Sequence, residues 1–239
     1  MRIDIMTLFP DMCRAVAGES IIGRAAAAGI IEINCVDIRA YTTNKHGKVD
    51  DAPYGGGMGM IMAPQPIFDC YEDICRARGS KQHLIYMSPK GKTLTQQRAR
   101  ELAEGDGFVI LCGHYEGVDQ RIIDEIVDEE ISVGDYVLTG GELPALTLAD
   151  CVCRMVKGVL SDDECFTEES HFAGLLEYPQ YTKPPVWHDV EVPAVLSSGH
   201  HANIKKWQRE RAIERTLERR PELLNNAELT KKELAFLDE

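Results

Sequence analysis

The chain has 239 residues, of which 44% are hydrophobic, as is typical of a globular protein with a sizeable core. No apolar run approaches the roughly 20 residues that a membrane-spanning helix needs, which argues against a membrane protein. The formal net charge of −13 argues at first against a nucleic-acid partner. The N-terminus enters a strand-like run without a signal peptide. Eight cysteines without C-x-x-C spacing, several in apolar runs (Cys35, Cys112, Cys151), favour buried free thiols in a reducing, cytoplasmic setting.

The N-terminal third predicts a strand, a helical segment, a second strand and a long loop. Residues 2–9 alternate as a strand does, and Pro10 opens a helical segment that continues toward Gly29. Residues 30–38 predict the second strand. Residues 41–62 are polar at first and end in a glycine-rich stretch with Gly55–Gly57, so they predict a sharply bent loop. Such a loop is more often functional than idle, although a flexible surface excursion stays open.

Strands and helices alternate through the middle of the chain. We expect strands over 83–87, 107–112 and 131–138, and helices over 94–103, 118–127 and 142–156. Thr93 is the predicted cap of the first of these helices, and Pro144 is tolerated in the first turn of the last. This alternation predicts an α/β domain with a mostly parallel sheet.

The C-terminal third has a different character. Residues 161–182 are polar and acidic, and Pro184-Pro185 blocks a helix. A long helix follows Gly199 and continues to about Arg219, and a short helix over 231–238 is capped by Thr230. We therefore divide the chain into a domain over 1–160, a linker over 161–175 and a small, mainly helical domain over 176–239.

Two glycine-bearing turns, Gly113–Gly117 and Gly140-Gly141, each follow an apolar run. Glycine lets the backbone approach a ligand closely, and α/β sheets bind small molecules at strand ends. We expect a pocket built largely from main-chain N–H and C=O groups, which suits a neutral moiety such as adenine better than a triphosphate. A Walker-type lysine and a G-x-G-x-x-G pattern are missing here.

The stretch Gly113–Pro144 also resembles the cofactor-binding region of the bacterial tRNA (guanine-N1)-methyltransferases of the TrmD type, which belong to the SPOUT class. The similarity extends to residues 8–10, 50–60, 86–89 and 219–224. It implies a deep trefoil knot in the parallel-sheet domain, a homodimer, and methyl transfer from S-adenosylmethionine to N1 of the guanosine at position 37 of tRNA. It also implies a tRNA-binding role for the C-terminal domain.

The resemblance assigns the cofactor to three loops. Val133 replaces the family's usual isoleucine, and Glu116 would balance the positive methionine moiety or would be a solvated turn carboxylate. Without the resemblance, Tyr136–Leu138 would simply be a core strand. The matched cofactor residues are Tyr86, Met87, Ser88, Pro89, Gly113, Tyr115, Glu116, Ser132, Val133, Gly134, Asp135, Tyr136, Val137, Leu138, Gly140, Gly141 and Pro144.

Methylating N1 of guanine requires a general base, because this nitrogen keeps its proton at neutral pH. The negative charge that then develops on O6 calls for a cation. By resemblance the cation is Arg154, and the base is Glu169 where the family has an aspartate. One extra methylene can misplace a catalytic group, and neighbouring Glu168 could share the role. Solvated charges are the alternative for all of these residues.

Residues 201–220 hold seven Lys and Arg against three Glu, so a basic stripe lies on an acidic chain. The resemblance matches His46 and Asp50 to tRNA contacts, and we add Ser170, Lys205 and Arg209 as candidates. A solvated helix face paired as Lys206–Glu210, Arg211–Glu214 and Arg215–Glu218 is the alternative. The family uses Mg²⁺, whose ligands the sequence does not identify, and we predict no structural zinc. Two alternative functions stay open: another SPOUT-class RNA methyltransferase, or a non-catalytic RNA-binding module that has lost its general base.

Overall fold

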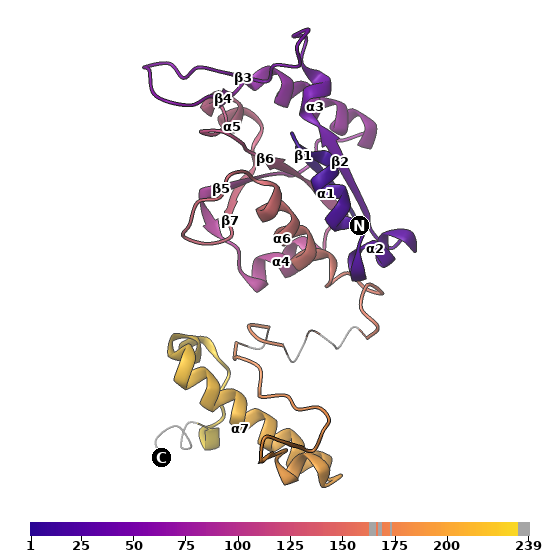
Figure 1. Ribbon diagram of the computed structural model, residues 1–239, viewed down its shortest axis with the longest axis vertical. Helices are drawn as coiled ribbons and strands as arrows, with labels where there is room; N and C mark the ends of the chain where they lie inside the picture. The colour runs from indigo at the N-terminus through magenta and orange to yellow at the C-terminus, as the bar shows by residue number, and fades with distance from the viewer. Residues whose placement is uncertain (163–165, 167–168, 173, 234–239) are drawn as a thin grey trace. The chain divides into compact units, whose positions relative to one another are not determined.

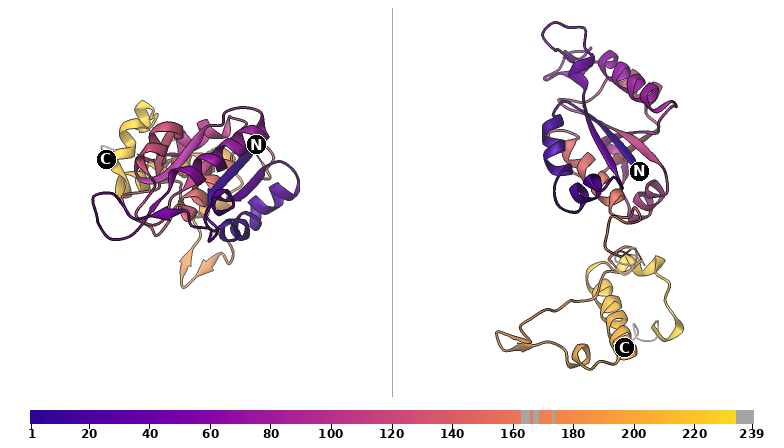
Figure 2. Two further views of the ribbon diagram at one scale, coloured as in Figure 1. Left: turned by 90° about the horizontal axis from the view of Figure 1, so that it is seen from above. Right: turned by 90° about the vertical axis from the view of Figure 1, so that its right-hand side faces the viewer.

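The computed structural model describes residues 1–162, 166, 169–172 and 174–233. The chain divides into two compact units, residues 1–162 and residues 163–239. Figures 1 and 2 show helices on both sides of the sheet in the first unit and a long helix in the second. Within the described residues, no helix combines the length and the apolar character needed to cross a membrane.

A five-stranded sheet in the order β2-β1-β6-β5-β7 forms the centre of the first unit. The strands are β1 (Arg2–Thr7), β2 (Glu32–Asp37), β5 (Leu84–Thr93), β6 (Gly107–Cys112) and β7 (Glu129–Ser132). Every neighbouring pair is parallel, and Arg2 of β1 lies opposite both Glu32 and Gly107. The predicted α/β class with a parallel sheet is therefore confirmed.

Helices cover both faces of this sheet, because its strands direct apolar side chains to both faces. Helices α1 (Pro10–Ala17) and α4 (Gln96–Ala103) both contact α6 (Glu142–Cys153) in one layer. Helices α3 (Pro64–Arg78) and α5 (Gln120–Ile126) contact each other in the opposite layer. Met6 and Leu111 are fully buried in a cluster with Tyr71 of α3 and Ile122 of α5. The core thus occupies both sides of the sheet.

Several predicted elements begin or end elsewhere in the structure. The helical segment over 10–29 is two helices, α1 and α2 (Ser20–Ala27), separated at Gly18, whose amide still donates to the Arg14 carbonyl. The cap of α4 is Thr95, whose Oγ1 accepts from the Arg98 amide at 3.1 Å. Thr93 belongs to β5, so the predicted cap was wrong by two residues.

The strand predicted over 131–138 ends at Ser132. Ser132 Oγ donates to the Gly134 carbonyl at 2.9 Å, and the Tyr136 amide donates to the same carbonyl at 2.9 Å. These bonds turn the chain out of the sheet, so the strand prediction was wrong from Val133 onward. Val137 is 81% exposed, which shows that an apolar run need not be a core strand.

The longest helix of the first unit, α3, was not predicted. Its sequence nevertheless carries ordinary helix signals: Pro64 lies in the first turn, and Gly79 ends the helix in the left-handed conformation. Ile67, Tyr71 and Ile74 are buried at the spacing of one helix face.

The predicted loop over 41–62 bends sharply and is anchored at its base. It contains the short helix η1 (Ile38–Tyr41) at its start and the two-residue strands β3 (Asp50–Asp51) and β4 (Ile61–Met62). The Met62 amide donates to the Gly117 carbonyl at 2.9 Å, and the Glu116 amide donates to the Met60 carbonyl at 3.0 Å. The loop is therefore joined to the predicted glycine turn at 113–117.

The second unit has its own small core. It contains β8 (Val186–Trp187) and β9 (Val190–Glu191), the orange pair of arrows in the left view of Figure 2, then η2 (Ala194–Ser197), α7 (His201–Arg219) and η3 (Pro221–Asn226). Leu175, Ala212 and Ile213 are buried together. Buried Thr216 accepts from the Leu176 amide at 2.9 Å, which ties the preceding segment to α7.

Helix α7 follows Gly199 and ends at Arg219 as predicted. Thr230 Oγ1 accepts from the Glu233 amide at 3.3 Å, and Glu233 accepts from the Thr230 amide at 2.7 Å, as in a capping box. The predicted helix beyond Glu233 lies outside the described residues. Cys35 and Cys112 are buried free thiols, whereas Cys151 is partly exposed, so its predicted burial is incomplete.

Candidate functional site

A cavity of about 350 Å³ lies at the carboxyl ends of β6 and β7 and beside the bulge in β5 between Met87 and Lys92. Three segments, called the three loops below, surround it: residues 86–90 at the bulge of β5, residues 113–118 after β6, and residues 131–144 from the end of β7 onward. This end of a parallel sheet is where α/β proteins bind ligands, and the volume lies in the range of small-molecule sites. The three separate stretches chosen from the sequence therefore meet around one cavity.

Fifteen of the seventeen predicted cofactor residues line the cavity. The exceptions are Gly134, which shapes the turn after Ser132, and exposed Asp135. The sequence analysis missed six lining residues, and their signal was adjacency to the predicted ones. The missed residues are Lys90, His114, Gly117, Val118, Ile131 and Thr139.

Close contacts explain two glycines of the site, with backbone at Gly141 and with side chains at Gly140. A Cβ on Gly141 would lie 2.7 Å from the Cys112 Cα and 2.9 Å from the Gly113 nitrogen, so a side chain there must displace backbone. The Gly141 amide donates to the Gly113 carbonyl at 2.8 Å, which joins two of the loops. A Cβ on Gly140 would lie 2.7 Å from His114 Nδ1. Main chain thus forms much of this wall, as predicted.

Tyr86 supplies a buried hydroxyl to the cavity. Its side chain is 6% exposed, and a Cβ on Gly113 would lie 2.8 Å from its oxygen. Burial, with a contribution from Glu130, raises the pKa of Tyr86 to about 12. The hydroxyl is therefore protonated at neutral pH and can donate a hydrogen bond to a ligand.

Below the Gly140 turn lies a buried carboxylate. Glu142 is the first residue of α6 and is 4% exposed. Its Oε1 accepts from Thr7 Oγ1 at 2.8 Å, and the helix N-terminus favours its negative charge. His114 Nδ1 is buried and has no hydrogen-bond partner among the described residues.

Tyr115 and Glu116 stand at the mouth of the cavity. Tyr115 has φ +59°, in the left-handed region that non-glycine residues seldom adopt and that often marks functional sites. Glu116 is exposed, and a Cβ on Gly59 would lie 2.6 Å from its Oε1. The glycine-rich loop therefore closes against this carboxylate.

The two predicted catalytic residues belong to different units. Arg154 caps the C-terminus of α6, half-buried, and its amide donates to the Asp150 carbonyl at 3.1 Å. Glu169 is half-buried in the second unit, and its amide donates to the Phe166 carbonyl at 3.4 Å. Glu168, the alternative base, lies outside the described residues.

The predicted RNA contacts lie in varied settings. His46 is exposed and its amide donates to Asn44 Oδ1 at 2.8 Å, while Asp50 begins β3. Ser170 Oγ accepts from the Glu177 amide at 2.9 Å, so its hydroxyl bonds to backbone within the second unit.

On α7, Lys205 is exposed, whereas Arg209 pairs with Glu233 at 2.7 Å and donates to the Glu228 carbonyl at 2.8 Å. The pairs predicted at Lys206–Glu210 and Arg211–Glu214 are present. Arg215 instead donates to the Glu177 carbonyl at 3.4 Å. The basic stripe is thus partly engaged in holding its own unit together.

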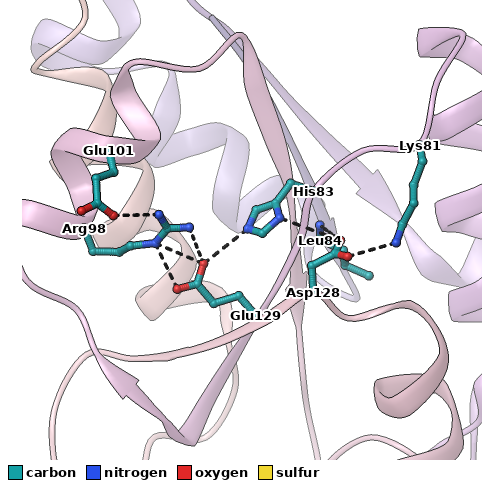
Figure 3. Close-up of polar contacts among 7 residues, drawn as sticks. All are labelled: Lys81, His83, Leu84, Arg98, Glu101, Asp128 and Glu129. Atoms are coloured by element: carbon teal, nitrogen blue, oxygen red, sulfur yellow. Dashed lines mark hydrogen bonds and ion pairs between the residues drawn. The ribbon is translucent and has the colours of Figure 1, made fainter.

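A separate ionic network lies at the opposite end of the sheet, where β5 and β7 begin (Figure 3). Arg98 Nε and Nη2 donate to both carboxylate oxygens of Glu129 at 2.7–3.2 Å, and His83 Nε2 lies 3.3 Å from Glu129. Burial opposes ionisation of Glu129, but hydrogen bonds from Arg98 and His83 outweigh it and hold the pKa of Glu129 below its usual value. This network links α4 to the sheet, and none of its residues lines the cavity.

No group of three or more His, Cys, Asp and Glu side chains suited to a metal ion occurs within the described part of the chain. The fold and the cavity together define an α/β protein with a parallel sheet and a cavity that three loops surround.

Comparison with known proteins identifies the family. Residues 1–226 match the family model described as tRNA (Guanine-1)-methyltransferase TrmD. A tRNA (guanine-N(1)-)-methyltransferase of Ruminiclostridium cellulolyticum is 56% identical over 225 residues, which cover 94% of this chain and 97% of that protein. Proteins of the same name from Alkaliphilus oremlandii and Halalkalibacterium halodurans are 54% and 49% identical and match 100% of this chain and 98% and 97% of their own lengths. The chain belongs to the TrmD family.

Proposed function

We propose that this protein transfers a methyl group from S-adenosylmethionine to N1 of the guanosine at position 37 of tRNA. The observation that carries the proposal is the convergence of three sequence-distant loops on one cavity, lined by fifteen of the seventeen residues matched to the family's cofactor site. The family's printed description, a tRNA (Guanine-1)-methyltransferase, agrees with this reaction.

The cavity has features that fit S-adenosylmethionine. Its three loops offer main-chain groups to an adenine, and the protonated Tyr86 hydroxyl adds a donor. Glu116 at the mouth would balance the positive charge of the methionine moiety. When bound, the cofactor supplies an electrophilic methyl group. Gly141 allows the loop after β7 to lie directly against the backbone of residues 112 and 113, which forms this wall of the cavity.

Within this function Glu169 accepts the proton from N1 of guanine, and Arg154 stabilises the charge that develops on O6. The two residues belong to separate units of one chain. We propose a homodimer in which the cavity of one copy faces the second unit of the other copy. Exposed Met12 and Val16 on α1 and exposed Leu143 on α6 provide an apolar surface for such a contact.

We also propose the SPOUT-type knot in the first unit. Ile131 of β7 pairs with Met87 and again with Lys92 of β5, so the intervening chain bulges around the strand end. The domains would be the knotted cofactor-binding domain over 1–160, the linker over 161–175 and the tRNA-binding domain over 176–239. Mg²⁺ is proposed to assist the reaction, with no ligands assigned, and the cytoplasm is the expected compartment.

Methyl transfer from labelled S-adenosylmethionine to a tRNA transcript with guanosine at position 37 tests the proposal. A transcript with adenosine at that position is the RNA control. We expect label only on guanosine, recovered as 1-methylguanosine. Cofactor binding without transfer would support an RNA-binding module instead, and a different labelled nucleoside would support another RNA methyltransferase.

The base is tested with Glu169→Gln, which keeps the side-chain length and removes the basic oxygen. We expect transfer to fall by at least about 100-fold, a common contribution of a general base, while cofactor affinity stays unchanged. Glu177→Gln is the matched control, because Glu177 bonds to Ser170 through its backbone amide. Full activity of Glu169→Gln would remove Glu169 from the mechanism.

A further inference from the structure

A row of flat side chains runs from the cavity outward over the first unit. Tyr115 and His114 line the cavity, with ring centroids 4.9 Å apart in an edge-on arrangement. Phe9 lies outside the cavity lining, and its ring centroid is 5.0 Å from that of His114. The Arg39 guanidinium lies over Phe9, 5.4 Å from the ring centroid. We call these four residues the aromatic rim.

The rim is held in position although the rings of Phe9 and Tyr115 are exposed. Phe9 is 41% exposed and Tyr115 is 44% exposed. The Phe9 amide donates to Thr7 Oγ1 at 2.9 Å, at the end of β1, and Arg39 Nη1 donates to the Leu8 carbonyl. Tyr115 occupies the left-handed backbone region, which turns its side chain to the mouth of the cavity. Fixed, exposed rings offer a flat partner a preorganised surface.

The chemistry of the rim fits a nucleobase. Unpaired bases are commonly held by stacking on Phe, Tyr and His rings and on Arg guanidinium planes, and every base has a π-face. The inner members of the rim, His114 and Tyr115, face the cavity, whereas the outer members, Phe9 and Arg39, lie beyond it. A base on Phe9 therefore lies outside the cavity proposed for the cofactor, beside the mouth at which the reacting base must meet the methyl group.

We propose that the aromatic rim stacks the nucleobase next to the methylated guanosine, with Phe9 as the principal platform. The inference rests on the proposed function, and it adds a substrate subsite that positions the RNA strand at the mouth of the cofactor cavity.

A fluorescent base tests the contact directly. An RNA hairpin with guanosine at the target position would carry 2-aminopurine at the preceding or at the following nucleotide, and would be titrated with the full chain and S-adenosylhomocysteine. Stacking on a ring quenches 2-aminopurine. We expect quenching at one of the two positions with the unaltered protein and with Phe9→Tyr. Phe9→Leu, which keeps apolar bulk but removes the ring, should abolish it.

Kinetics provide the second readout. In methyl transfer, Phe9→Leu should raise the KM for the RNA about fivefold or more, the lower end of the stacking range, and leave the KM for S-adenosylmethionine unchanged. Phe9→Tyr should behave as the unaltered protein.

Two results would overturn the inference. One is quenching by Phe9→Leu equal to that of the unaltered protein. The other is a change in the molar mass of Phe9→Leu in solution, which would assign Phe9 to a contact between copies of the chain. Failure of the unaltered protein to methylate guanosine 37 is a different outcome, because it refutes the proposed function itself.

Discussion

Thr7 and Glu142 are 135 residues apart in the sequence, yet the Thr7 hydroxyl donates to Glu142 Oε1 at 2.8 Å. Both side chains are buried, at 0% and 4% exposure. The bond joins the end of β1 to the start of α6, directly below the Gly140 turn. A buried carboxylate is cut off from water, so without its donor it would lack a hydrogen bond that water cannot replace. Loss of this contact should therefore destabilise the first unit.

Thr7→Val should lower the free energy of unfolding by about 1–3 kcal/mol, because it keeps the shape of the side chain and removes the hydroxyl. Urea denaturation measures the change. Thr7→Ser, which keeps the hydroxyl, is the control and should lose less. An unchanged free energy of unfolding in Thr7→Val would contradict the prediction, because this variant lacks only the hydroxyl.

Gly141→Ala should weaken binding of S-adenosylmethionine by about tenfold or more, since the added Cβ meets the backbone of residues 112 and 113 within 3 Å. The backbone of Gly141 has φ −82°, so the effect is steric and not a consequence of strained φ. Isothermal titration calorimetry measures the affinity. Gly105→Ala, whose Cβ would have its nearest neighbour at 3.5 Å, should bind normally. Unchanged binding by Gly141→Ala would show that this wall of the cavity is pliable.

The network of Figure 3 predicts a pH-dependent contribution to stability. Burial opposes ionisation of Asp128, but the Leu84 amide and Lys81 outweigh it, so the pKa of Asp128, like that of Glu129, lies below its usual value. Folding therefore gains free energy above the unfolded-state pKa values, about 3.9 for Asp and 4.3 for Glu, and loses it as pH falls through the lower native values.

Arg98→Met should cost about 1 kcal/mol of stability at pH 7, because the Arg98 side chain is 33% exposed and solvent screens the pair. The cost should shrink below about pH 4, where the carboxylates become protonated. Denaturation curves between pH 3 and 7 test this. Arg98→Lys keeps the charge but cannot contact Glu129 through two nitrogens, so its stability should lie between those of the unaltered protein and Arg98→Met. A cost that does not vary with pH would point to lost packing of the Arg98 stem instead.

Lys205→Ala should weaken tRNA binding and lower the slope of log K against log salt by about one, as expected for a lost phosphate contact. Lys206→Ala is the matched neighbour, since Lys206 pairs with Glu210 at 3.7 Å, and it should change the slope less. Arg209→Ala should instead destabilise the second unit, because Arg209 bonds to Glu233 and to the Glu228 carbonyl. Equal slopes for both lysine variants would remove Lys205 from the RNA surface.

The fold class could be predicted because strand-like and helix-like apolar patterns alternate along the chain. The bounds of particular elements show which features these patterns do not predict. Strand β6 has the predicted bounds because Gly107 starts it and the glycine turn follows it. The end of β7 could not be predicted, since Val137 and Leu138 are as apolar as core residues but line the cavity. Apolar residues that face a ligand and those that face a core have the same pattern in the sequence.

The lining of the cavity was predicted from loops that carry glycine and match the family. His114 was missed because nothing in the sequence shows that its ring would face Gly140 and Phe9. The Thr7–Glu142 hydrogen bond could not be predicted either, because a contact between residues 135 positions apart depends on the assembled sheet. The distribution of Arg209 and Lys205 between internal pairing and solvent likewise depends on how the C-terminal segment packs on α7.

The position of β1 inside the sheet has a consequence for biosynthesis. Strand β1 is synthesised first, but Arg2 can pair with Gly107 only after β6 has been synthesised. The Thr7 hydroxyl can bond to Glu142 only later still. Such long-range pairing makes folding slow, because bringing distant segments together costs entropy before their contacts stabilise the fold. A nascent chain shorter than about 145 residues therefore has no cavity, and a cofactor that binds only the finished unit would stabilise it selectively against degradation.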